Sequence, residues 1–189
     1  MQRELSLDGN APAAEEPNDG HSESPLFADA IGFRASPNEV YYATARWIDD
    51  DKFEIGGSEM LTVPRCAMHG PQKLQFLRTN IADVIKALGV KAAFVKEEGY
   101  SGYGKDGSRL RIEGVIQELV ASGEVETFAS GRLAEIGRLI GLDKSKCKDL
   151  KKNKRTWDDL EDPDWGMYEE AQRESILSAI AALHLDGYR

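Results

Sequence analysis

A dense block of basic side chains lies late in this 189-residue chain. Between residues 144 and 155, seven basic residues stand against the single acid Asp149, a net charge of +6 in a chain whose formal charge is −9. The basic residues are Lys144, Lys146, Lys148, Lys151, Lys152, Lys154 and Arg155. Such a block attracts phosphate groups and gains affinity from the counterions it releases. We therefore expect it to contact DNA, RNA or an acidic partner.

An acidic segment follows this block directly. Its acids are Asp158, Asp159, Glu161, Asp162 and Asp164, and Trp157 and Trp165 flank them. Two interpretations stay open: the two halves neutralise each other in a flexible loop, or the acidic half competes with an outside ligand for the lysines. In both, residues 143–166 form a charged loop.

A glycine-rich segment, residues 99–106, comes close to a phosphate-binding P-loop, because Gly99 is followed after four residues by Gly104-Lys105. A P-loop needs Ser or Thr next, since that hydroxyl binds the Mg²⁺ of the nucleotide. Asp106 stands there instead. We interpret the segment as a strand-to-helix loop in which Lys105 contacts a nucleic-acid backbone and Tyr100 and Tyr103 stack on bases.

The cysteines and histidines do not define a metal site or a nucleophile. Cys66 and His69 have the spacing of half a zinc site, but neither Cys147 nor His184 has a second ligand nearby in the sequence. Two cysteines cannot build a disulfide framework, which favours a reducing, cytoplasmic location. We expect no metal ligands among these residues, and no motif of nucleophilic catalysis is present.

The local patterns predict the elements that must position these residues. β-Prone runs come first and amphipathic helices alternate with short apolar strands afterwards, which indicates an α/β fold. The expected strands are 27–34, 39–47, 52–63, 90–95 and 125–129, and the expected helices are 71–88, 108–122, 130–140 and 169–183. Gly89, Gly123 and Gly141 mark three helix ends. The order is therefore β-β-β-α-β-α-β-α-α.

The first 24 residues differ from the rest. They carry six acids against Arg3 and few large apolar groups, a composition typical of a disordered acidic tail. They contain no apolar run of a secretory signal, and no stretch of the chain reaches the ~18 apolar residues of a membrane-spanning helix. We expect one folded domain over residues 25–189, with no membrane contact.

The element order and several short motifs resemble the RNase H-like superfamily, most closely its RuvC-like branch, and also a group of uncharacterised bacterial proteins of this fold. Residues 31–36 (IGFRAS) resemble the first strand of the resolvases, and residues 94–98 (FVKEE) resemble their fourth strand. The helix around Glu174 lies where the family places its last acids. The resemblance covers roughly residues 27–186 and implies a five-stranded mixed sheet.

The resemblance also implies where catalytic residues should be. Family members use three or four carboxylates to hold two Mg²⁺ ions that promote phosphodiester cleavage. Here Arg34 occupies the first-strand position, where a guanidinium would repel a divalent ion. The fourth-strand position is either Lys96 or Glu97, because neighbouring strand residues face opposite ways. The candidate catalytic acids that remain are Glu97, Glu98 and Glu174.

These observations favour a catalytically degenerate RuvC-like protein. We expect it to act as an accessory subunit of a bacterial or phage system that binds nucleic acid or a protein partner, with Arg34 and Lys96 available to hold a phosphate and no cofactor required. One alternative is an Mg²⁺-dependent endonuclease with a rearranged carboxylate site made of Glu39, Glu97, Glu98, Asp106 and Glu174. Another is a pure protein-interaction module.

Overall fold

The computed structural model describes residues 28–49, 52–67, 69–98, 107–123, 125–155 and 164–185. The predictions for the acidic tail and for Tyr100, Tyr103, Lys105 and Asp106 fall outside these ranges. The same holds for the acidic run at residues 158–162 and for Trp157.

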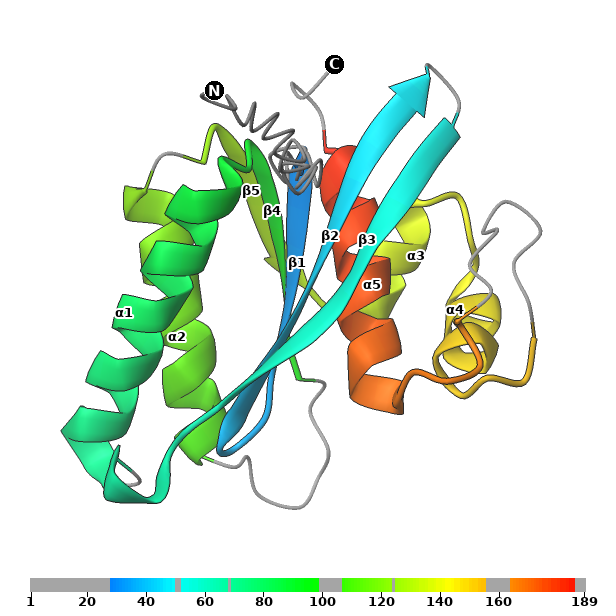
Figure 1. The fold of residues 1–189 in the computed structure, drawn as a ribbon. Coiled ribbons are helices and arrows are strands. Elements are labelled where there is room, and N and C mark those ends of the chain that lie inside the picture. Colours follow the sequence, from blue (N-terminus) through cyan, green and yellow to red (C-terminus); the bar gives the residue numbers. More distant parts are fainter. Residues whose placement is uncertain are drawn as a thin grey trace, which may run out of the picture.

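Five strands form one mixed sheet (Figure 1). They are β1 (Ala30–Ala35), β2 (Glu39–Asp49), β3 (Lys52–Thr62), β4 (Ala92–Lys96) and β5 (Thr127–Gly131), in the spatial order β3-β2-β1-β4-β5. The first three strands pair antiparallel, whereas β4 pairs parallel with both β1 and β5. The antiparallel part follows from short turns such as Ser36-Pro37-Asn38, and the parallel part from helical crossovers.

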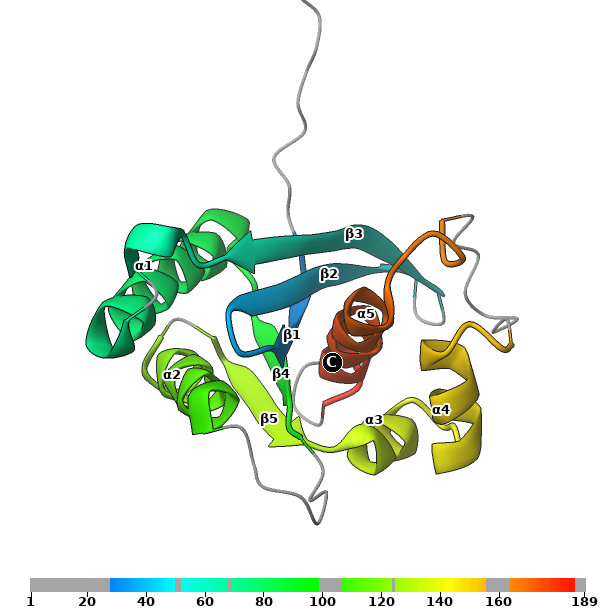
Figure 2. The same ribbon diagram turned by 90° about the horizontal axis from the view of Figure 1, so that it is seen from below.

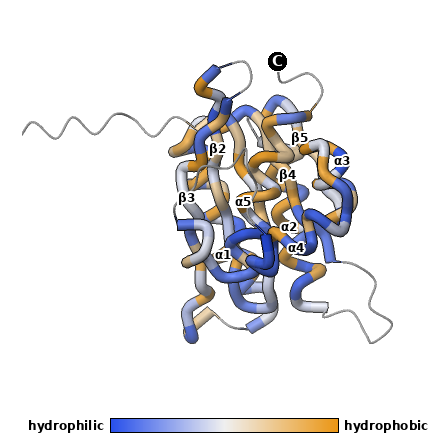
Figure 3. Tube along the Cα trace, turned by 90° about the vertical axis from the view of Figure 1, so that its right-hand side faces the viewer, coloured by the Kyte–Doolittle hydropathy of each residue, from blue (hydrophilic) through white to orange (hydrophobic). Residues whose placement is uncertain are grey.

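Helices cover both faces of the sheet (Figures 1 and 2). On one face lie α1 (Gly70–Leu88) and α2 (Gly107–Ser122), and on the other lie α3 (Leu133–Leu139), α4 (Lys144–Lys151) and α5 (Glu170–Leu183). A short 3-10 turn, Arg65–Ala67, precedes α1. Because both faces are covered, β1 and β4 read as apolar runs, and Figure 3 shows apolar residues along α5 and the central strands.

The close packing of α5 on β1 depends on Gly32. A Cβ built on Gly32 would lie 2.1 Å from the backbone N of Ala179 and 2.3 Å from the carbonyl oxygen of Ser175. The absence of a side chain lets the helix backbone rest directly on the central strand. This contact fixes the distance between α5 and the sheet. It therefore also determines how deeply the α5 side chains that face the sheet are buried.

The element order agrees with the sequence prediction except at residues 144–151. This part of the expected charged loop is helix α4, because Cys147 and Leu150 lie on one face and are buried in the core. Asp143 caps the helix by accepting a hydrogen bond from the backbone N–H of Lys146 at 2.8 Å. Among the described helices, none combines the length and apolar content needed to cross a membrane.

Candidate functional site

The candidate site lies where β1 and β4 end side by side. Arg34 and Lys96 are the last register partners of these two parallel strands. Along β1, Gly32 contacts α5, whereas Phe33 and Ala35 belong to the opposite core layer. Since side chains alternate along a strand, Arg34 and Lys96 both project toward α5, where Glu174 meets them.

Glu174 binds three cationic side chains. Its Oε2 lies 3.1 Å from Arg34 Nε, and its Oε1 lies 3.2 Å from Lys96 Nζ and 3.0 Å from Lys151 Nζ. Only 3% of the Glu174 side chain is exposed, against 19% for Arg34 and Lys151 and 7% for Lys96. We call these four residues the Glu174 cluster. Lys151 also reaches Glu170 Oε1 at 2.8 Å, near the solvent.

The cluster keeps Glu174 ionised. Burial by itself raises the pKa of this carboxyl, but the charges of Lys96 and Lys151 outweigh burial and hold the pKa below its ordinary value. Lys151 shows the complementary effect, because Glu170 and Glu174 overcome its own desolvation and raise its pKa. Burial lowers the pKa of Lys96, and the charge of Glu174 opposes this. The three cations thus share a single buried anion.

A second set of contacts surrounds the exposed side of Arg34. Its guanidinium also contacts the Ser36 hydroxyl and lies over the Tyr41 ring, 5.9 Å from the ring centroid. The Tyr41 hydroxyl donates to Glu39 Oε2 at 2.8 Å, and burial together with this carboxylate raises the Tyr41 pKa to about 12. Arg34 is therefore held in place from several sides.

Of the two residues considered for the fourth-strand position, Lys96 and Glu97, the structure directs Lys96 toward Glu174. Glu97 faces the opposite side of the sheet, where its Oε1 accepts hydrogen bonds from Ser130 Oγ at 2.8 Å and Gln117 Nε2 at 3.2 Å. Glu98 pairs with Arg109, which also binds Glu113 Oε1 at 2.9 Å. The structure does not bring Glu97, Glu98 and Glu174 together, because Glu97 and Glu98 contact residues of α2 whereas Glu174 meets Arg34 and Lys96 on the other side of the sheet.

The residues at the strand ends do not suit a divalent metal. Mg²⁺ prefers several oxygen ligands, whereas this position offers one carboxylate whose two oxygens already bind Arg34, Lys96 and Lys151. Within the part of the chain that the structure describes, no three His, Cys, Asp or Glu side chains gather closely enough to hold an ion.

The basic block divides into two groups. Lys144, Lys146, Lys148, Lys152, Lys154 and Arg155 are exposed on or just after α4. Lys151 instead turns inward to Glu174 and Glu170, and its role as a nucleic-acid contact stays a prediction. The sequence feature that indicates this inward direction is the position of Lys151 next to Leu150 and four residues after Cys147. This spacing is informative only if residues 144–151 form a helix.

Other predicted and unpredicted residues have structural roles. Cys147 is buried in the core and its thiol pKa is raised to about 11, chiefly by burial, whereas Cys66 is exposed. Arg173 ties α5 to the preceding segments, since its Nε donates to the Lys151 carbonyl oxygen at 2.7 Å. The pairing of Arg109 with Glu113 is not among the predicted contacts, although its four-residue spacing on an expected helix is a recognisable signal.

Comparisons with known proteins identify the fold. No family model and no curated protein sequence matches the chain. Among solved structures, RuvC from T. thermophilus bound to a Holliday junction substrate matches with a TM-score of 0.57 at 10% identity, over 82% of this chain and 92% of that chain. A second T. thermophilus RuvC structure gives a TM-score of 0.56 at 10% identity, with the same coverages.

The yeast mitochondrial Holliday junction resolvase Ydc2 also matches, with a TM-score of 0.49 at 12% identity, over 85% of this chain and 80% of that chain. The likeness to T. thermophilus RuvC, together with the strand order, shows that the chain has the RuvC-like form of the RNase H-like fold. This confirms the fold expected from the sequence.

Proposed function

We propose that this protein is a catalytically degenerate RuvC-like protein that binds nucleic acid without cleaving it, as an accessory subunit of a larger system. The observation that carries the proposal is the Glu174 cluster at the carboxyl ends of β1 and β4. Arg34 and Lys96 take positions where the resemblance calls for metal-binding acids, and Glu174 neutralises part of their charge.

The cluster argues against two-metal phosphodiester cleavage. That chemistry requires two metal ions, one at the attacking oxygen and one at the leaving oxygen of the substrate. Anionic oxygens of the protein must hold both ions. Here the only acid of the cluster is already engaged by three fixed positive charges, and an arriving Mg²⁺ would meet their repulsion. A fixed guanidinium or ammonium supports binding of a phosphate, but it does not generate a metal-bound nucleophile.

The exposed lysines of α4 support nucleic-acid binding. Lys144 and Lys148 lie one turn apart on α4, and Lys152 and Lys154, which follow the helix, are also exposed. The RuvC of T. thermophilus, which shares the fold, was solved with a Holliday junction. Positive charge concentrated on one helix of an acidic protein suits a local phosphate contact rather than coating of the whole surface.

Charge reversal on α4 tests this contact. The double variant Lys144→Glu/Lys148→Glu is expected to weaken binding of duplex and four-way-junction DNA at low salt by at least roughly tenfold. It should also reduce the slope of log affinity against log salt by about 1 for each lysine that contacts a phosphate. Fluorescence anisotropy over a series of salt concentrations measures both quantities.

The matched control is Lys86→Glu/Lys91→Glu, which reverses two exposed lysines near the end of α1. This control changes the net charge equally and should leave most of the affinity intact. Equal losses in both variants would show that only overall charge matters. Absence of binding by the unaltered protein at low salt would favour the protein-interaction module instead.

A further inference from the structure

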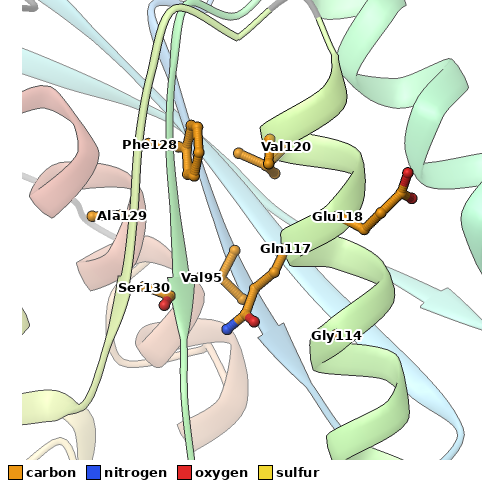
Figure 4. A pocket seen from close by; sticks show the side chains of 9 residues that line it. Val95, Gly114, Gln117, Glu118, Val120, Phe128, Ala129 and Ser130 are labelled. Atoms are coloured by element: carbon orange, nitrogen blue, oxygen red, sulfur yellow. The ribbon is translucent and has the colours of Figure 1, made fainter.

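A groove on the opposite side of the sheet has no role in the Glu174 cluster. It lies between α2 and β5, has a volume of about 430 Å³, and falls within the roughly 300–1,000 Å³ typical of ligand sites. Figure 4 shows Phe128 and Val120 facing each other across it, while Gln117 extends toward Val95 and Ser130. A Cβ built on Gly114, which also lines the groove, would meet nothing within 4 Å.

The groove has an aromatic end and a polar end. At one end, the Phe128 side chain is 50% exposed on the edge strand β5, although most large apolar side chains of the sheet are buried. At the other end, Gln117 and Ser130 line the groove, and both donate to Oε1 of Glu97, whose carboxylate lies next to these lining residues. An accessible ring beside a few convergent polar groups is the arrangement that binds a flat polar ring.

We propose that this groove holds an unpaired nucleobase of the bound nucleic acid, with the base stacked on Phe128 and its N–H groups donating to Glu97. The proposal rests on the proposed function and adds a second contact, remote from α4. Stacking on an aromatic side chain is available to every base, because each base has a π-face. Among the bases, guanine offers two adjacent donors on its Watson–Crick edge, and we expect it to be preferred.

The surface beside the groove carries charges of both signs, since Glu126 and Glu135 are exposed along with the basic residues. In Figure 2, α2, β5, α3 and α4 lie along the same side of the molecule, away from β3. Arg132 and Arg138 are exposed just before and on α3, the helix that follows β5. On the rim, Glu118 Oε2 is neutralised by Arg78 Nε at 3.4 Å. We expect the phosphates of a strand whose base enters the groove to contact Arg132 and Arg138.

Single-stranded oligonucleotides test the inference. The probes are a labelled oligothymidine and the same strand with one central guanine, measured by fluorescence anisotropy against the full chain. Phe128→Ala is expected to weaken binding of both strands by roughly tenfold, whereas Phe128→Tyr retains the affinity. Glu97→Gln is expected to weaken binding of the guanine-containing strand more than binding of oligothymidine, and so to reduce the preference for guanine.

Duplex DNA separates this inference from the proposed function. Binding of a blunt duplex through α4 should be the same in Phe128→Ala and in the unaltered chain. If duplex binding persists and Phe128→Ala loses no affinity for single strands, the groove does not hold a base. A loss matched by Phe128→Tyr would also overturn the inference, because a tyrosine ring stacks as well as phenylalanine. If neither duplex nor single strand binds, the proposed function itself fails.

Discussion

Replacing Glu174 by glutamine is expected to destabilise the fold by about 3–5 kcal/mol, because three buried or half-buried cations lose their common counterion. Glutamine keeps the size of the side chain, so the loss reports charge rather than packing. For a domain of this length, the corresponding fall in Tm is roughly 6–20 °C. Urea unfolding followed by circular dichroism measures the free-energy difference directly.

Glu170→Gln is the matched control, since Glu170 lies on the same helix and also contacts Lys151 but is 51% exposed. Its loss should be at most about 1 kcal/mol. The pH dependence gives a second readout. Because the pKa of Glu174 is held below its ordinary 4.5, its contribution is complete above that value and disappears as the pH falls through the lowered pKa. The gap between Glu174→Gln and the unaltered protein should therefore narrow in acid, and a constant gap would contradict the ionic account.

Gly32→Ala is expected to cost about 3 kcal/mol or more, or to prevent folding. The new methyl group would fall within 2.5 Å of three backbone atoms of α5, and backbone atoms cannot move aside as a flexible side chain can. The helix would have to lift from β1, which would also draw Glu174 away from Arg34 and Lys96. Expression of soluble protein and its thermal unfolding measure the effect.

Gly114→Ala tests whether the cost at Gly32 is specific. Gly114 is an exposed position of α2 with open space around its Cβ direction, so alanine there should stabilise the fold by about 0.5–1 kcal/mol through helix propensity. Comparable behaviour of the two variants would show that the contact between α5 and β1 has little effect on stability.

The sequence predicts the fold better than it predicts the site. The β-prone hairpins, the glycine-terminated helices and the motif around Arg34 suffice for the α/β assignment. The resemblance to the RuvC-like branch, rather than these patterns, implies that Arg34 and Glu174 share one region, and the structure brings Arg34 Nε and Glu174 Oε2 to 3.1 Å. Sequence patterns do not decide whether Lys96 or Glu97 faces the site, because a register shift of one residue exchanges the two faces of the sheet. The register in the structure pairs Lys96 with Arg34 and decides the question.

Two features could not be read from sequence patterns for physical reasons. The segment around Lys151 is so highly charged that it resembles a solvated loop, although Cys147 and Leu150 share one face of a helix. The groove at Phe128 depends on β5 being an edge strand, and strand order is a property of the whole chain. Both features arise from tertiary packing rather than from local preference.

Titration of Mn²⁺ into the protein by calorimetry, combined with Mg²⁺- and Mn²⁺-dependent cleavage assays on branched, duplex and single-stranded DNA, tests the central claim most directly. The account predicts no saturable Mn²⁺ binding at the ends of β1 and β4 and no cleavage of any substrate. Saturable binding together with cleavage that Glu174→Gln abolishes would show that the cation cluster opens to form a two-metal site, and would contradict the account.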